Sequence, residues 1–118
     1  MIGELITRCF HARTIAHIHH LKTKSYATHV ALQGFYEDIL GLVDGIAEAY
    51  QGKYGLIDSY PGRYSYVDDS VTLVKGLAEW IEANRYECCD AEDTCLQNMI
   101  DELLALCAGT TYKLRFLK

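Results

Sequence analysis

One long amphipathic segment, residues 25–51, constrains this chain more than any other feature of its sequence. Its apolar side chains recur at alternating intervals of three and four residues, which places them on one face of an α-helix. Ser25 is of a type that caps helix starts, and Gly52 follows the last apolar position, so a single helix is predicted between them. The apolar face consists of Leu32, Tyr36, Ile39, Val43, Ile46 and Tyr50. Such a face must be covered by other elements of the fold.

A second segment with helical period, residues 2–21, predicts a helix before the long one. Only Lys22–Lys24 separates the two, and so short a link favours antiparallel packing. The next segment, residues 52–69, is the one long connection in the chain, because Gly, Pro and Tyr concentrate there and the period is lost. We expect its tyrosines to be buried over the helices.

Two more helices are predicted after this connection. The first begins near Asp69 or Ser70, and the second begins after a break at Glu87–Asp90, with Asp90 as its candidate cap. No segment has a convincing strand pattern, so the expected fold is an all-α four-helix bundle with a long crossover between its second and third helices. A chain of 118 residues makes one such domain, residues 1–118, around one modest core.

Composition narrows the class of protein. Apolar residues make up 50% of the chain, with one Pro and no low-complexity run, which disfavours disorder. No apolar stretch approaches the roughly 18 residues that span a bilayer, and charges interrupt the N-terminal segment, so neither a membrane span nor a signal peptide is expected. Five cysteines without framework spacing favour a reducing compartment such as the cytoplasm. A formal charge of −5 and the lack of a basic tail disfavour nucleic-acid binding.

The residues best suited to metal chemistry lie in and just before the long helix. His17 and His20 are three residues apart and therefore neighbours on the first helix, and His29 lies early in the second. Asp44 and Glu48 are four residues apart near the far end of the second helix. Imidazole and carboxylate are common ligands of iron, zinc and manganese, so these five residues are candidate metal ligands. His17 and His20 would alternatively form half of a zinc site.

These ligands cannot all meet within one chain. His29 and Asp44 are separated along one straight helix by roughly 22 Å. Two copies of the helix packed antiparallel about a twofold axis would bring the imidazoles of one copy to the carboxylates of the other. The sequence therefore predicts that a metal site would be shared between two copies of the chain.

This pattern resembles the ferroxidase region of the Dps branch, the mini-ferritins, of the ferritin-like proteins. That family has a His-Trp pair at the end of one helix, a second His in the next helix, an acidic residue four positions later, and an Asp-x-x-x-Glu pair. His20 stands where the His-Trp pair would be, in a shorter loop, whereas His17 keeps the ungapped spacing to the second His. His29 matches the second His, and Asp44 and Glu48, within VDGIAEAYQG, match the carboxylate pair.

The resemblance covers residues 17–51 and implies a fold, an assembly and an activity. It implies a ferritin-like bundle that forms a homodimer or a larger shell, and an iron site with ferroxidase activity; zinc or manganese are alternative ions. One chain would supply His29 with His20 or His17, and its partner would supply the two carboxylates. Gln33 departs from the pattern, because it stands where the family has an acidic iron ligand.

A second hypothesis is a non-catalytic helical interaction or structural protein that keeps the fold without the metal chemistry, and Gln33 favours it. The segments HLKTKSYATHVAL and FYEDI and the ending TTYKLRFLK also resemble a small phage-encoded ferritin-like family. An accessory or virion component of a phage would act with a partner protein in the host cytoplasm or in the virion.

The other reactive side chains carry weaker signals. His11 and His19 are expected to be exposed and to bind no metal. Cys88 and Cys89, followed by Cys95, give a weak metal or redox signal, because adjacent cysteines chelate one tetrahedral ion poorly. In the simplest interpretation, the histidine of the long helix only makes hydrogen bonds at a helix interface, and the carboxylate pair is solvated.

Overall fold

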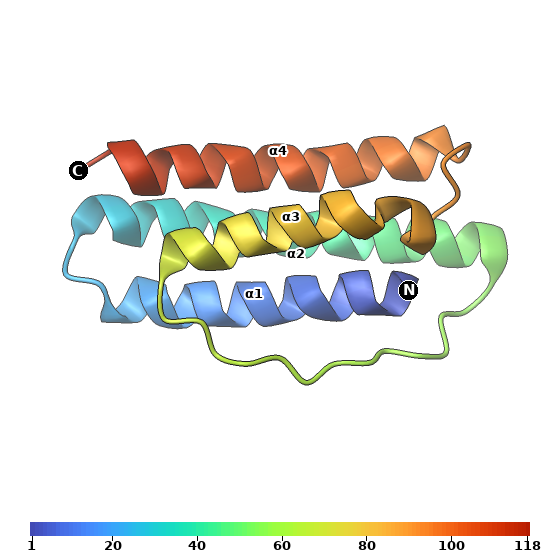
Figure 1. The fold of residues 1–118 in the computed structure, drawn as a ribbon, viewed down its shortest axis with the longest axis horizontal. Helices are drawn as coiled ribbons and strands as arrows, with labels where there is room; N and C mark the ends of the chain where they lie inside the picture. Colours follow the sequence, from blue (N-terminus) through green and yellow to red (C-terminus); the bar gives the residue numbers. More distant parts are fainter.

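The computed structural model describes all of residues 1–118 and contains four α-helices and no strand. α1 and α4 run in one direction, and α2 and α3 run in the other (Figure 1). α1 packs against α2 and α3, and α4 packs against the same two helices, so every pair of helices in contact is antiparallel. The prediction of an all-α chain with four helices is confirmed. The helices are α1 (Ile2–Lys22), α2 (Tyr26–Tyr54), α3 (Ser70–Cys88) and α4 (Thr94–Phe116).

The core lies between the four helices and follows the predicted apolar faces. Leu32, Ile39 and Ile46 of α2 are fully buried, whereas the two tyrosines of the same stripe are half-buried. Each fully buried aliphatic side chain contributes about 1.5–3 kcal/mol through removal of its surface from water. No helix of the chain has both the length and the apolar run that crossing a membrane requires.

The start of α2 is as predicted, but its end is not. The Ser25 hydroxyl accepts a hydrogen bond from the backbone N–H of Thr28 at 3.2 Å, which satisfies a free donor of the first turn. The expectation that Gly52 follows the helix is wrong, because α2 continues through it to Tyr54. Gly55 ends the helix instead, with a φ of 95° that a side chain would strain.

The cap of α4 is Asp93, and the expectation that Asp90 caps this helix is wrong. The Asp93 carboxylate accepts from the backbone N–H of Leu96 at 3.1 Å and from Lys53 Nζ at 2.8 Å. It also accepts from the hydroxyl of Tyr54. Asp90 instead accepts from the backbone N–H of Glu92 at 2.8 Å within the turn between α3 and α4. The cap of α4 is thereby tied to the last turn of α2.

This cap predicts an acid-sensitive stability. The hydrogen bonds from Lys53, Tyr54 and Leu96 lower the pKa of Asp93 to about 2 from its ordinary value of 3.8. A lowered folded-state pKa stabilises the fold at every pH above the unfolded-state value, and this stabilisation is lost as pH falls through the folded-state pKa. We therefore expect urea unfolding at neutral pH to show a less stable Asp93→Asn variant. Between pH 4 and 2, the variant should lose less stability than the wild type.

Asp58→Asn, an exposed carboxylate in the connection, is the control for removal of one negative charge. It should follow the wild type across the whole acid range. If both variants flattened the pH dependence equally, the effect would come from net charge and the cap would not be its cause.

The connection between α2 and α3 runs along the whole length of α1 (Figure 1). Near the start of α1, the Thr7 hydroxyl donates to the carbonyl oxygen of Pro61 at 2.6 Å. One turn later, His11 Nε2 donates to the carbonyl oxygen of Ser65 at 3.0 Å. We expected the tyrosines in and beside this segment to be buried. That expectation is wrong for Tyr54, Tyr60 and Tyr66, which are 57, 48 and 44% exposed. Only Tyr64 is half-buried.

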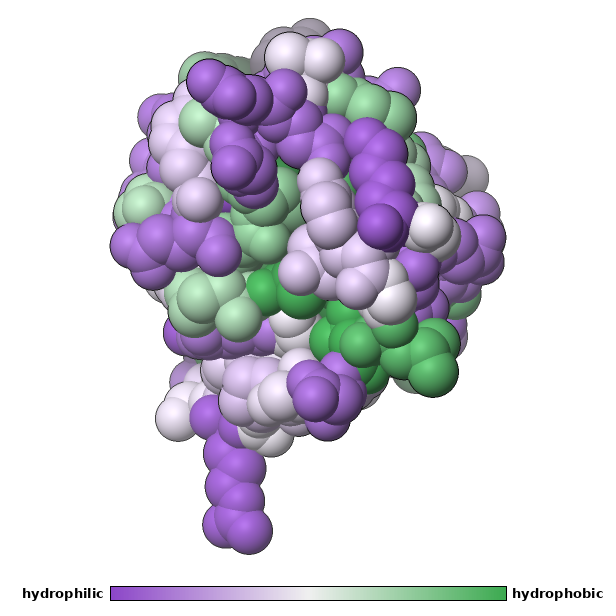
Figure 2. Space-filling view, turned by 90° about the vertical axis from the view of Figure 1, so that its right-hand side faces the viewer, coloured by the Kyte–Doolittle hydropathy of each residue, from purple (hydrophilic) through white to green (hydrophobic).

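One end of the molecule carries an exposed apolar patch. Figure 2 faces the end at which α2 terminates, and hydrophobic side chains gather at one place on an otherwise mainly hydrophilic surface. At this end, Leu56 is 86% exposed and Met1 is 48% exposed. The first residues of the connection therefore leave α2 without burying their largest apolar side chain.

Candidate functional site

The structure brings three of the five predicted ligands together. The short link between α1 and α2 places the last turn of α1 beside the first turns of α2, and the rings of His20 and His29 stack with their centroids 3.6 Å apart and an interplanar angle of 18°. The His17 ring lies 5.9 Å from that of His20. We call His17, His20 and His29 the histidine cluster. His20 is 7% exposed, and the other two are half-buried.

Reciprocal hydrogen bonds fix two of these rings. His20 Nδ1 lies 2.7 Å from the carbonyl oxygen of His29, and His29 Nδ1 lies 2.8 Å from the carbonyl oxygen of His20. A carbonyl oxygen only accepts, so Nδ1 carries the proton and donates in both rings. In the neutral ring, Nε2 then keeps its lone pair, and it has no hydrogen-bond partner within the chain for either histidine. Backbone carbonyls hold metal-binding imidazoles in the same way.

Tyr36 supports the cluster in a way that the sequence did not reveal. Its ring stacks on that of His17 with centroids 4.1 Å apart, and it meets His20 edge-on at 5.1 Å. As one of the apolar stripe positions, Tyr36 was assigned to the core alone. The only feature of the sequence that could have indicated this contact is an aromatic residue at a stripe position close to three histidines. The stacking restricts the rotation of His17 and aligns it with its neighbours.

The two predicted carboxylates do not approach the histidine cluster within the chain. Asp44 and Glu48 are exposed on α2 and make no hydrogen bond or ion pair. Gln33, one turn after the cluster residue of α2, is exposed and donates to the Glu37 carboxylate at 3.0 Å. No group of three or more His, Cys, Asp or Glu side chains in the single chain could hold a metal ion. Within one chain the predicted ligands therefore do not form a metal site.

A family assignment covers most of this structure. DUF5856, described as a family of unknown function, matches residues 20–114. The chain belongs to this family. No curated protein and no solved structure matches the chain. The residues matched in this DUF5856 protein include His20, His29 and both carboxylates and begin after His17. A family of unknown function assigns no role to any of them.

The expectation that His19 is exposed is wrong. It is 6% exposed, because the start of α3 and the end of the connection cover this side of α1. Its Nδ1 lies 2.8 Å from the Ser70 hydroxyl, and its Nε2 is buried without a partner. His11, also expected to be exposed, is half-buried beneath the connection. Both histidines face α3 and its approach, away from the histidine cluster.

Four of the five cysteines of this DUF5856 protein are buried. Burial raises the pKa of Cys107 to about 12 and the pKa values of Cys88 and Cys89 to about 11. A buried, protonated thiol is a poor nucleophile and a poor metal ligand. Cys95 is exposed on α4. The buried thiols of Cys88, Cys89 and Cys107 pack as small apolar groups in the core.

Proposed function

We propose that this protein is a ferritin-like bundle of the Dps type, in which residues 55–69 form the long crossover, and that it binds and oxidises iron at a site shared by two copies. The observation that carries the proposal is the pair of reciprocal hydrogen bonds, which leaves Nε2 of His20 and His29 free to bind a metal. The antiparallel contacts of the helices and the resemblance of residues 17–51 to mini-ferritins support it.

A second copy would supply what one chain lacks. α1 and α2 expose large apolar side chains, among them Phe10, Leu21 and Leu40, which are 40, 72 and 37% exposed. An antiparallel partner helix would cover such side chains and bring its Asp44 and Glu48 to the histidine cluster. Each carboxylate is exposed and without a partner, so it is free to turn towards an ion.

The residues have distinct roles in this proposal. The partner's carboxylates hold and bridge the iron, because ionised oxygen ligands offset its charge. The histidine cluster completes the coordination and leaves positions open for the oxidant. Two Fe(II) ions then give one electron each to dioxygen, which takes up two protons and leaves as hydrogen peroxide.

Iron binding and oxidation on the purified protein test the proposal. We expect a dimer or a larger shell by light scattering, saturable binding of Fe(II) without oxygen, and aerobic oxidation faster than in buffer. The double variant Asp44→Asn/Glu48→Gln should lose iron while keeping its helical circular dichroism. Glu82→Gln/Glu102→Gln, exposed carboxylates on α3 and α4, is the matched control and should behave as the wild type. A monomer that binds no iron would contradict the proposal.

A helical interaction protein without metal chemistry is the second candidate, and Gln33 favours it. This side chain is neutral and already donates to Glu37 at the position where the mini-ferritins have an acidic ligand. In that case, the same experiment would find no bound iron and no oxidation in a stable helical protein. A phage accessory or virion component that binds a partner protein would fit this outcome.

A further inference from the structure

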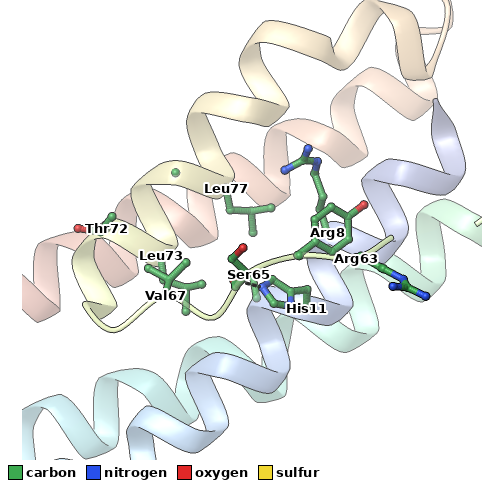
Figure 3. Close-up of a pocket in the computed structure, with 11 residues that line it drawn as sticks. Arg8, His11, Arg63, Ser65, Val67, Thr72, Leu73 and Leu77 are labelled. Carbon is green, nitrogen blue, oxygen red and sulfur yellow. Dashed lines mark hydrogen bonds between the residues drawn. The ribbon is translucent and has the colours of Figure 1, made fainter. Parts of the chain in front are cut away.

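A cavity of about 440 Å³ lies between α1, the connection and α3, on the side of α1 away from the histidine cluster. This volume is within the range of sites that hold small molecules. Figure 3 shows Leu73 and Leu77 on the α3 side and Val67 on the connection, with Ser65 and His11 across from them. The wall towards α3 is therefore mainly apolar, with Thr72 as its polar residue, and the other polar groups lie towards α1 and the connection.

Gly76 keeps one part of the cavity wall open. It lies within α3 among the lining residues, and a Cβ built on it would meet no atom within 4 Å. A glycine inside a helix costs about 0.5–1 kcal/mol relative to alanine. A larger residue would therefore fit at position 76, and it would also stabilise the helix, yet the chain has glycine there.

The charged side chains that line the cavity are two arginines, one of which is paired with Glu4. Arg8 and Arg63 are among the lining residues, and no Asp or Glu is among them. Glu4 accepts from Nε and Nη2 of Arg8 at 3.1 and 3.0 Å, which leaves Nη1 without a partner. The Arg8 guanidinium is held 4.5 Å from the Trp80 ring and 4.9 Å from the Tyr64 ring. This arginine is therefore fixed in place with one nitrogen free.

Arg63 stands at the rim. Its side chain is exposed, has no acidic partner and extends away from Leu73 and Val67 in Figure 3. The Ser65 hydroxyl is directed towards Leu77 in Figure 3 and has no hydrogen-bond partner in the chain. His11 donates from Nε2 to the Ser65 carbonyl, so Nδ1 of its neutral ring is an acceptor and does not serve a carboxylate. A ligand with one negatively charged end could accept hydrogen bonds from the Ser65 hydroxyl and the arginines while its remainder contacts the leucines.

We propose that this cavity binds a small carboxylate with an apolar aromatic or aliphatic body. The volume limits the ligand to a compact molecule, and the leucine wall favours an apolar body. The arginines favour a carboxylate over a neutral group, because guanidinium–carboxylate hydrogen bonds are charge-assisted. The site is independent of the iron proposal, since none of its lining residues belongs to the histidine cluster or to the carboxylate pair.

The test uses 4-phenylbutyrate as the probe and 4-phenylbutanamide as its neutral analogue, in titrations followed by amide chemical shifts. We expect saturable binding of the carboxylate with a dissociation constant below about 1 mM and at least tenfold weaker binding of the amide. The shifted resonances should belong to residues of α1, α3 and the connection. No iron is present in the experiment, so its outcome does not depend on the iron proposal.

Two variants locate the binding. Gly76→Leu should fill the cavity and weaken binding at least tenfold, whereas Gly109→Leu should leave binding unchanged, because Gly109 is also helical with open space around it. Arg63→Gln removes a charge from the rim and should weaken binding of the carboxylate about threefold without changing that of the amide. Equal affinity for carboxylate and amide, unchanged binding in Gly76→Leu, or no saturable binding would each overturn the proposal.

Discussion

Gly3→Ala is expected to lower the free energy of unfolding by about 2–3 kcal/mol, although alanine is the better helix former. A Cβ on Gly3 would lie 1.8 Å from the carbonyl oxygen of Ser59 and 2.9 Å from its carbonyl carbon. Both atoms belong to the backbone of the connection, so no side-chain rotation relieves the clash and the connection must move. That movement would break the hydrogen bond from Thr7 to the carbonyl of Pro61, two residues further on.

Urea unfolding followed by circular dichroism measures this effect, and Gly109→Ala is its matched control. Gly109 is helical and a Cβ there meets nothing within 4 Å, so the control should be more stable than the wild type by up to about 1 kcal/mol. The two alanine variants are thus expected to differ in sign. If Gly3→Ala were as stable as the control, the connection would not be seated on α1 as the structure describes.

The close approach at Gly3 also shows what the sequence could not reveal. The helical period predicted the number and the approximate limits of the helices, because an apolar stripe is a local pattern. The path of the connection depends instead on contacts between residues more than fifty positions apart, such as Thr7 with Pro61. The same path buries His19 and forms the cavity, so neither was visible in the order of residues.

The helix ends were mispredicted for a related reason. Gly52 and Gly55 are equally able to end a helix by type, and only the second adopts the positive φ. Asp90 and Asp93 are equally able to cap α4, and Lys53 and Tyr54 reach only the second. In both cases the choice between two suitable residues is made by the fold around them.

The candidate site was predictable in its composition but not in its geometry. A short link between antiparallel helices makes the approach of His20 and His29 foreseeable. Their reciprocal hydrogen bonds, which decide which ring nitrogen is free, depend on atomic positions that spacing does not supply. The carboxylate pair is exposed, as expected for residues that act only across an interface or not at all.

Gln33→Glu, which rests on the proposed function, is expected to tighten Fe(II) binding about tenfold or more. In the proposed resemblance, Gln33 stands where the mini-ferritins have an acidic ligand, and it donates to Glu37 at 3.0 Å. In the variant, two carboxylates one turn apart repel each other by about 0.2–0.5 kcal/mol in the absence of metal. A cation bound between the two carboxylates attracts both and offsets their repulsion. The variant should therefore be slightly less stable than the wild type without iron and more stable than the wild type with iron. Anaerobic titration and thermal unfolding with and without Fe(II) measure both effects.

A general gain in negative charge would also attract a cation, and Asn98→Asp separates this cause from ligation. Asn98 is exposed on α4 and belongs to neither proposed site. Its replacement by Asp adds one negative charge, as Gln33→Glu does, so the two variants have the same net charge. Attraction over long range should raise iron affinity only slightly and should disappear in salt, whereas a ligand next to the ion is screened much less. A tenfold gain confined to Gln33→Glu would place iron beside this turn of α2. Equal gains in both variants would mean that iron is not held there, and would favour an interaction protein that keeps the bundle without its chemistry.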